Sequence, residues 1–172
     1  MRRWLLLAAA ALAAALVLFP RGSHADRRLH ARVVRPVDGD TLVASAGGRA
    51  FYVRLLGIDT PETHRPGRPV ECGGREASAK MLALAPPGLQ IELETDPGQD
   101  RVDRYGRLLA YVWLPDGRLL EDEQLRSGWA TSYVFAGKPV SLFARLLAAE
   151  RVARSGRRGV WGECGGRFHS AL

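Results

Sequence analysis

Cysteine is scarce in this sequence: Cys72 and Cys164 are the only two among 172 residues. So few thiols exclude a zinc site built mainly from cysteines, and they leave either one disulfide bond or two free thiols. No two of the four histidines lie at metal-ligand spacing from each other, and Ser78 has no histidine partner in view. The sequence therefore disfavours both a zinc hydrolase and a serine hydrolase.

Acidic residues are absent from the first 25 positions, which begin with two of their three arginines, continue with an apolar run over 4–19, and end with a small-residue pattern over 23–25. This arrangement predicts a secretory signal peptide over 1–25, cleaved after Ala25. The alternative is a membrane anchor, but a helix of that run spans only about 24 Å, against about 30 Å of hydrocarbon. We therefore expect a secreted or periplasmic protein, with an N-terminally membrane-anchored protein as the alternative.

Internal repeats and low-complexity tracts are absent beyond that segment, and the chain has room for one core, so one domain over 26–172 is predicted. Removing 1–25 would take Lys and Arg from 25 to 22 against 18 Asp and Glu, and the net charge from +7 to +4. A basic surface suits polyanions, although a modest charge is weak evidence. Export favours a Cys72–Cys164 disulfide over two thiols, and it would hold the C-terminal part against the domain.

Short runs of alternating apolar and polar residues follow the leader. They predict five strands, over 31–37, 41–46, 49–58, 89–95 and 107–114. Asp38-Gly39 and Gly47-Gly48 are typical hairpin turns that would join the first three strands. The first three strands are therefore expected to form an antiparallel meander.

Helical spacing of apolar residues predicts three helices, over 74–85, 119–127 and 140–155. The segment 129–135 is predicted to be extended, and the tail after Trp161 to be a loop. This order of elements predicts a mainly β fold with helices. The specific expectation is a five-stranded Greek-key OB-fold barrel with about three helices, whose open face commonly binds oligonucleotides.

Four short stretches carry the residues of greatest chemical interest: 38–41 (DGDT), 54–62 (RLLGIDTPE), 74–78 (GREAS) and 103–107 (DRYGR). Taken singly, each has a structural explanation as a hairpin turn, a strand end, a helix start or a solvated loop. Together, in this order and spacing, they closely resemble the staphylococcal nuclease (thermonuclease) family. The resemblance covers about residues 31 to 161.

Hydrolysis of a phosphodiester needs a cation on the phosphate oxygens, donors that match the developing negative charge, and a carboxylate near the attacking water. Asp40 and Asp59 could meet across a barrel and supply two hard oxygen ligands for a divalent ion. Arg54 and Arg107 present planar forks that bind phosphate oxygens, and we assign both to transition-state stabilisation. Glu62 supplies the remaining carboxylate.

The resemblance implies which ion binds and how. It implies calcium (Ca2+), held by Asp40, Asp59 and the main-chain carbonyl of Thr60, with Asp38 acting from the second shell through a water. A site with so few carboxylates should bind weakly, in the range of about 10⁻⁴ to 10⁻³ M typical of extracellular calcium modules.

By the same resemblance, water attacks phosphorus in line and the 5′-oxygen departs, with Glu62 either orienting the water or taking its proton. Arg104, Tyr105 and Tyr133 align with family positions that grip the terminal phosphate and base, although Tyr133 is equally explained as a core or rim residue. Arg104 stands where lysine is usual. Glu121 stands where the family commonly has asparagine, and both cysteines are absent from the founding member.

The sequence therefore predicts an exported, calcium-dependent nuclease that cuts DNA or RNA and acts as a monomer. Nothing suggests readout of base edges, so we expect little sequence preference. One alternative is an OB-fold module that binds nucleic acid without cutting it. Another is a membrane-tethered interaction domain whose leader is retained.

Overall fold

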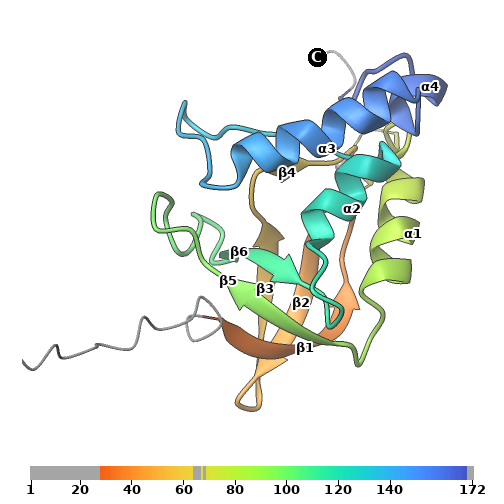
Figure 1. Ribbon diagram of the computed structural model, residues 1–172. Helices are drawn as coiled ribbons and strands as arrows, with labels where there is room; N and C mark the ends of the chain where they lie inside the picture. Colours follow the sequence, from red (N-terminus) through yellow and green to blue (C-terminus); the bar gives the residue numbers. More distant parts are fainter. Residues whose placement is uncertain (1–27, 64–66, 68, 170–172) are drawn as a thin grey trace, which may run out of the picture.

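The computed structural model describes residues 28–63, 67 and 69–169 of this chain (Figure 1). The predicted signal peptide over 1–25 and its cleavage point lie outside the described residues. Within the part of the chain that is described, no helix has the length and apolar character needed to cross a membrane.

A closed barrel of five strands forms one half of the domain, in the order β1-β2-β3-β6-β5 with β5 paired back onto β1. Its strands are β1 (Leu29–Pro36), β2 (Thr41–Ala46), β3 (Arg49–Leu55), β5 (Gln90–Glu94) and β6 (Leu108–Trp113). Every pair is antiparallel except β3 with β6, which is parallel. The predicted five-stranded OB fold is confirmed.

The barrel interior is filled by apolar side chains from its strands. Leu42 on β2 pairs in register with Val53 on β3, and both are fully buried together with Leu93 on β5. Burying a side chain of this kind stabilises the fold by about 1.5 to 3 kcal/mol. The core therefore fixes β3, which carries Arg54, and the strand ends on either side of the turn that carries Asp38 and Asp40.

Four helices lie at one end of the barrel (Figure 1). They are α1 (Gly74–Leu84), α2 (Leu120–Ser127), α3 (Phe143–Ser155) and α4 (Val160–Glu163). The predicted helices thus form, although α3 begins three residues later than expected. The prediction of a loop after Trp161 was wrong in part, because α4 continues to Glu163 and Phe168 is buried with its ring centroid 4.8 Å from that of Trp161.

The predicted strand over 49–58 is interrupted. β3 ends at Leu55, and after a bend the short strand β4 (Ile58–Asp59) pairs with β7 (Thr131–Ser132), which is the only regular strand within the predicted extended segment 129–135. The bend depends on Gly57, whose φ is +71° and whose hypothetical Cβ would lie 2.6 Å from Leu146 Cδ1. Only glycine tolerates both that conformation and that closeness. The bend directs the chain after Ile58 away from the barrel and towards β7.

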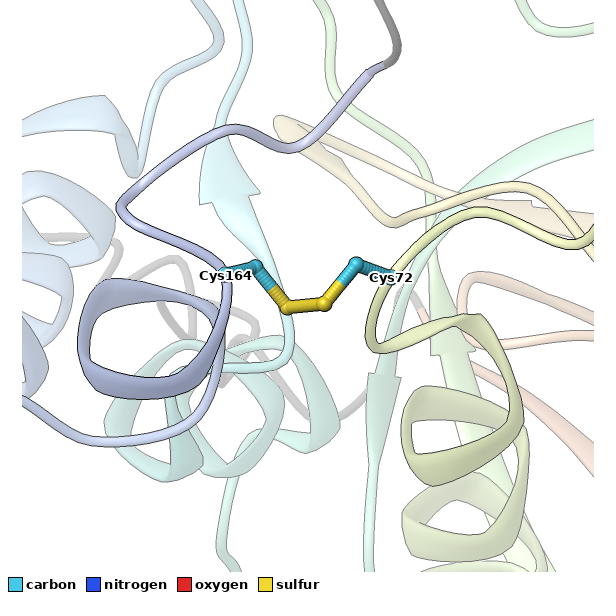
Figure 2. The surroundings of a disulfide bond; sticks show 2 residues. All are labelled: Cys72 and Cys164. Carbon is cyan, nitrogen blue, oxygen red and sulfur yellow. A yellow bond between two sulfur atoms is a disulfide. The ribbon is translucent and has the colours of Figure 1, made fainter.

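Cys72 and Cys164 form a disulfide bond across a sequence separation of 92 residues, with their Cα atoms 5.9 Å apart. Figure 2 shows that the bond joins the segment that leads into α1 to the segment that follows α4. The predicted pairing is therefore present, and it holds the C-terminal segment beside the start of α1.

Candidate active site

The turn between β1 and β2 carries the first two carboxylates of the site. Asp38 Oδ1 accepts the N–H of Asp40 at 3.0 Å, which closes a local side-chain turn. Asp40 Oδ2 accepts both the N–H and the hydroxyl of Thr60 at 3.1 Å, and Oδ1 accepts the hydroxyl of Thr41 at 3.0 Å. These bonds fix the orientation of Asp40 relative to the strand end that carries Thr60.

The same turn is anchored to the helices. The Gln124 side chain, fully buried on α2, donates to the carbonyl of Gly39 at 2.6 Å and to that of Ala77 on α1 at 3.1 Å. A Cβ at Gly39 would lie 2.7 Å from the Cβ of Ala77. The turn therefore needs glycine at this position and lies directly against α1.

Arg54, on β3, connects the two aspartates that the sequence singled out. Its Nη2 lies 3.1 Å from Asp40 Oδ2 and 3.0 Å from Asp59 Oδ1, and its Nη1 donates to the carbonyls of Leu55 and Ile58 at 2.9 Å. Only 14% of the Arg54 side chain is exposed. One buried guanidinium thus holds the two carboxylates on either side of itself.

A polar cavity of about 430 Å³ contains these groups. Its lining consists of Asp38, Asp40, Arg54, Asp59, Thr60, Pro61, Glu62, Tyr105, Arg107 and His169. Every residue that we assigned to catalysis or to metal binding from the sequence therefore lies on one cavity, together with His169, which we did not assign.

Arg107 follows the β5–β6 loop and is oriented by Asp103. Its Nε donates to Asp103 Oδ2 at 2.7 Å, and its backbone N–H donates to Asp103 Oδ1 at 3.0 Å. Its guanidinium carbon also lies 5.3 Å from the centre of the Tyr105 ring. Asp103 thus fixes one edge of the Arg107 fork. These hydrogen bonds lower the pKa of Asp103 despite its partial burial, so that carboxylate stays ionised.

Glu62 lies at the rim of the cavity, where Glu71 holds its backbone on both sides. The Glu62 N–H donates to Glu71 Oε2 at 2.8 Å, and the Glu71 N–H donates back to the Glu62 carbonyl at 3.0 Å. The Glu62 side-chain Oε1 accepts the N–H of Thr63 at 3.0 Å. The position of the Glu62 carboxylate therefore depends on Glu71, a residue that no sequence motif indicated.

A second, more apolar cavity of about 420 Å³ shares Arg54, Asp59, Tyr105 and Arg107 with the first. Its lining also includes Arg104 and Tyr133, the other residues assigned to nucleotide binding, and Phe135, which sequence reasoning missed. Tyr105 and Phe135 are 68% and 65% exposed. Exposed aromatic rings beside a polar cavity are suited to stacking on nucleobases.

The carboxylates of the polar cavity repel one another. Burial and the neighbouring charge of Asp40 raise the pKa of Asp38 to about 6. Burial also raises the pKa of Asp59, and the attraction of Arg54 offsets only part of that rise. A divalent cation placed among these oxygens would relieve the repulsion between Asp38 and Asp40.

The donor set of the cavity fits a hard cation. Among residues 28–63, 67 and 69–169, no three Asp, Glu, His or Cys side chains converge closely enough to hold a metal by themselves. Asp40 and Asp59 nevertheless both contact Arg54 Nη2, and the backbone N–H of Thr60 donates to Asp40. Carboxylate oxygens brought this close together are the kind of donor that suits a hard divalent cation.

His169 reaches this cavity from the C-terminal segment. Its Nε2 lies 2.8 Å from Asp59 Oδ2 and its Nδ1 lies 3.0 Å from Glu71 Oε2. Partial burial lowers the pKa of His169, but Asp59 and Glu71 outweigh that effect and the pKa is raised. No sequence pattern indicated this contact, because its partners precede His169 by 110 and 98 residues.

An OB barrel that gathers carboxylates and arginines on one polar cavity belongs to a class of protein suited to binding phosphates of nucleic acids. The chain belongs to the staphylococcal nuclease family, since the sequence model described as "Staphylococcal nuclease homologue" matches residues 52–163. The resemblance stated from the motifs is therefore confirmed.

Curated relatives agree with this family. The chain is 33% identical over 147 residues to "Endonuclease YncB" of Bacillus subtilis (strain 168), covering 85% of this chain and 68% of that protein. It is 33% identical over 130 residues to a "Thermonuclease" of Staphylococcus hyicus, covering 76% and 74% of the two chains. It is 39% identical over 132 residues to "SPbeta prophage-derived endonuclease YokF" of Bacillus subtilis (strain 168), of which it spans only 43%. Membership of this family supports a nuclease function.

Proposed function

We propose that this protein is a calcium-dependent nuclease that hydrolyses phosphodiester bonds of DNA or RNA. The observation that carries the proposal is the Arg54 guanidinium bridging Asp40 and Asp59, with Arg107 and Glu62 on the same cavity. Positive donors, candidate cation ligands and a carboxylate on one cavity support the proposal, because all of them could act on a single phosphate. Those are the groups that the reaction requires.

The ion would be held by Asp40, Asp59 and the main-chain carbonyl of Thr60, with Asp38 acting through a water. When bound, calcium supplies positive charge to the phosphate oxygens and to the attacking water. The protein's contribution is to hold the ligands in place. Asp40 is fixed by three hydrogen bonds from Thr41 and Thr60, which restrict the rotation of its carboxylate.

Arg54 and Arg107 would bind the phosphate oxygens as negative charge spreads over them. Each has a planar fork that lysine cannot reproduce. Asp103 already orients Arg107 through its Nε, and the carbonyls of Leu55 and Ile58 orient Arg54. Such preorganised donors are worth about 10² to 10³ in rate each.

Glu62 would orient the attacking water or accept its proton, while the 5′-oxygen leaves on the opposite side of phosphorus. Its place on the cavity lining supports either role. Both roles require a carboxylate, so replacing it by an amide of the same shape should remove the contribution.

Tyr105, Tyr133 and Arg104 would hold the nucleotide on the apolar side, and Phe135 extends that surface. Arg104 Nη2 donates to the Tyr105 hydroxyl at 2.7 Å, which stiffens the rim. Stacking on an exposed ring contributes about 1 to 3 kcal/mol per base and is indifferent to base identity. The same surface therefore accepts DNA or RNA single strands.

We propose that the protein is exported and acts as a monomer.

The test is digestion of heat-denatured DNA and of RNA by the purified protein, with added calcium or with a chelator. Wild type should cut only with calcium, and Glu62→Gln should be slower by a factor of about 10² to 10⁴. Glu76→Gln, at an exposed position in the first turn of α1, is the matched control and should cut at the wild-type rate. Tight binding of single strands without any cutting by wild type would instead identify a binding module.

A further inference from the structure

His169 and Arg54 each contact a different carboxylate oxygen of Asp59. Asp59 Oδ1 contacts Arg54 Nη2, which also contacts Asp40, while Asp59 Oδ2 contacts His169 Nε2. A carboxylate with each oxygen bound to a different, fixed partner cannot rotate without breaking one contact. His169 therefore restrains the rotation of the Asp59 carboxylate, one oxygen of which lies beside Arg54.

The other nitrogen of the same ring reaches the residue that holds Glu62. His169 Nδ1 contacts Glu71 Oε2, and this same oxygen accepts the Glu62 N–H at 2.8 Å. One imidazole thus lies between the carboxylate of Asp59 and the backbone of Glu62. These two residues come from different parts of the cavity rim, and the His169 ring connects them by way of Glu71.

We propose that His169 is a positioning residue of the active site, which orients Asp59 for the cation and Glu62 for the attacking water. The inference rests on the proposed function, because only a nuclease would require those two carboxylates to be oriented for a cation and for a water. Groups that hydrogen-bond to a metal-binding carboxylate commonly change metal affinity or activity by about 10- to 100-fold when they are removed.

The path of the C-terminal segment supports a built contact. The disulfide attaches this segment to Cys72 (Figure 2), which directly follows Glu71 in the sequence. Phe168, which directly precedes His169, is buried. Cys72 and Cys164 are therefore close in sequence to Glu71 and His169, respectively, which form the contact. The covalent link and the buried ring hold His169 at the cavity while leaving 41% of its side chain exposed.

The first experiment is independent of catalysis. Hydrogen exchange at the Glu62 amide is measured by NMR on the calcium-free protein, for wild type, His169→Ala and the control His30→Ala, which alters an exposed histidine on β1. Exchange in His169→Ala should be about 3- to 10-fold faster, the effect of weakening one hydrogen bond. His30→Ala should match wild type.

The second experiment measures calcium affinity by titration calorimetry and the kinetics on a short single-stranded oligonucleotide. In His169→Ala the calcium dissociation constant should rise and kcat should fall. The two effects combined should amount to about 10- to 100-fold, and KM should change less than twofold. A residue that only anchors the tail would leave both constants unchanged in the folded protein.

The outcomes separate the inference from the proposed function. Wild-type exchange at Glu62 together with wild-type calcium affinity and kcat in folded His169→Ala would overturn the inference and leave the nuclease proposal intact. Faster exchange at Glu62 in a protein that neither binds calcium nor cuts nucleic acid would support the positioning contact and refute the proposed function.

Discussion

Arg54 Nη2 lies 3.0 Å from Asp59 Oδ1, and the same nitrogen lies 3.1 Å from Asp40 Oδ2. Breaking a largely buried ion pair leaves charges uncompensated, so this arginine also affects stability. The carbonyls of Leu55 and Ile58 occupy Nη1, so in the proposed mechanism Nε–H is the donor left over for the phosphate.

Replacing the planar fork of Arg54 should slow cutting more than it disturbs folding. Arg54→Lys keeps one positive charge near Asp40 and Asp59 but cannot make the same set of bonds, so kcat should fall by about 10² to 10³ while the protein remains folded. Arg49→Lys, at an exposed position on the same strand, is the control. Steady-state kinetics with circular dichroism make the comparison, and a near-normal kcat in Arg54→Lys would contradict the assignment.

Gly57 is required for the bend that ends β3. Gly57→Ala should destabilise the fold by about 2 to 4 kcal/mol, because alanine disfavours the positive φ and its Cβ would overlap Leu146 and Val140. Gly48→Ala is a matched control, since Gly48 has a φ of +76° but nothing within 4 Å of the added Cβ. Urea unfolding should show a smaller loss of about 1 to 2 kcal/mol for the control. Equal losses would mean that the packing contact is unimportant.

The Cys72–Cys164 bond should contribute to global stability. Its closure of a 92-residue span restricts the unfolded chain, so the double variant Cys72→Ser/Cys164→Ser should lose about 2 to 5 kcal/mol in urea unfolding. Wild type unfolded in the presence of a reductant should show the same midpoint as the variant. If the oxidised protein and the double variant had the same urea midpoint, the disulfide bond would make no contribution to the free energy of unfolding.

Glu121 should make stability depend on pH. Its side chain is fully buried and accepts the Val112 N–H at 3.2 and 3.3 Å, and burial raises its pKa well above the ordinary 4.5. Because the folded pKa exceeds the unfolded one, the protonated acid stabilises the fold at low pH. That contribution is lost as pH rises through the folded pKa.

Glu121→Gln removes this titration. As pH rises above the ordinary pKa of 4.5, the free energy of unfolding of wild type should therefore fall relative to that of the variant. Urea unfolding at several pH values measures the difference, and Glu76→Gln, at an exposed position, should follow wild type. A wild-type curve parallel to that of Glu121→Gln would show that the Glu121 carboxyl does not titrate differently on folding.

Much of the fold was predictable because its signals are local. Alternation of apolar and polar residues marked β2 at its observed bounds, and Pro86-Pro87 marked the end of α1 within a residue. The bend at Gly57 was not predicted, although an isolated glycine in a strand is a known sign of one. Its necessity comes from Leu146 on α3, far along the chain.

The candidate site was predictable to the extent that motifs carry it. Asp40, Arg54 and Asp59 belong to motifs, and the cavity contains them all. His169 and Glu71 belong to none, because they act through contacts that exist only after the C-terminal segment is brought back beside α1. Phe135 was missed for a similar reason, since a single aromatic residue after a short extended segment does not distinguish a core side chain from a rim side chain.

The hydrogen bonds from Gln124 to Gly39 and Ala77 attach the β1–β2 turn to the helices α1 and α2. A hairpin turn at the end of a barrel would otherwise be free to flex with solvent. Because these bonds tie the turn to α1 and α2, we expect a substitution that shifts either helix to move Asp38 and Asp40 as well, even where it alters no residue of the polar cavity.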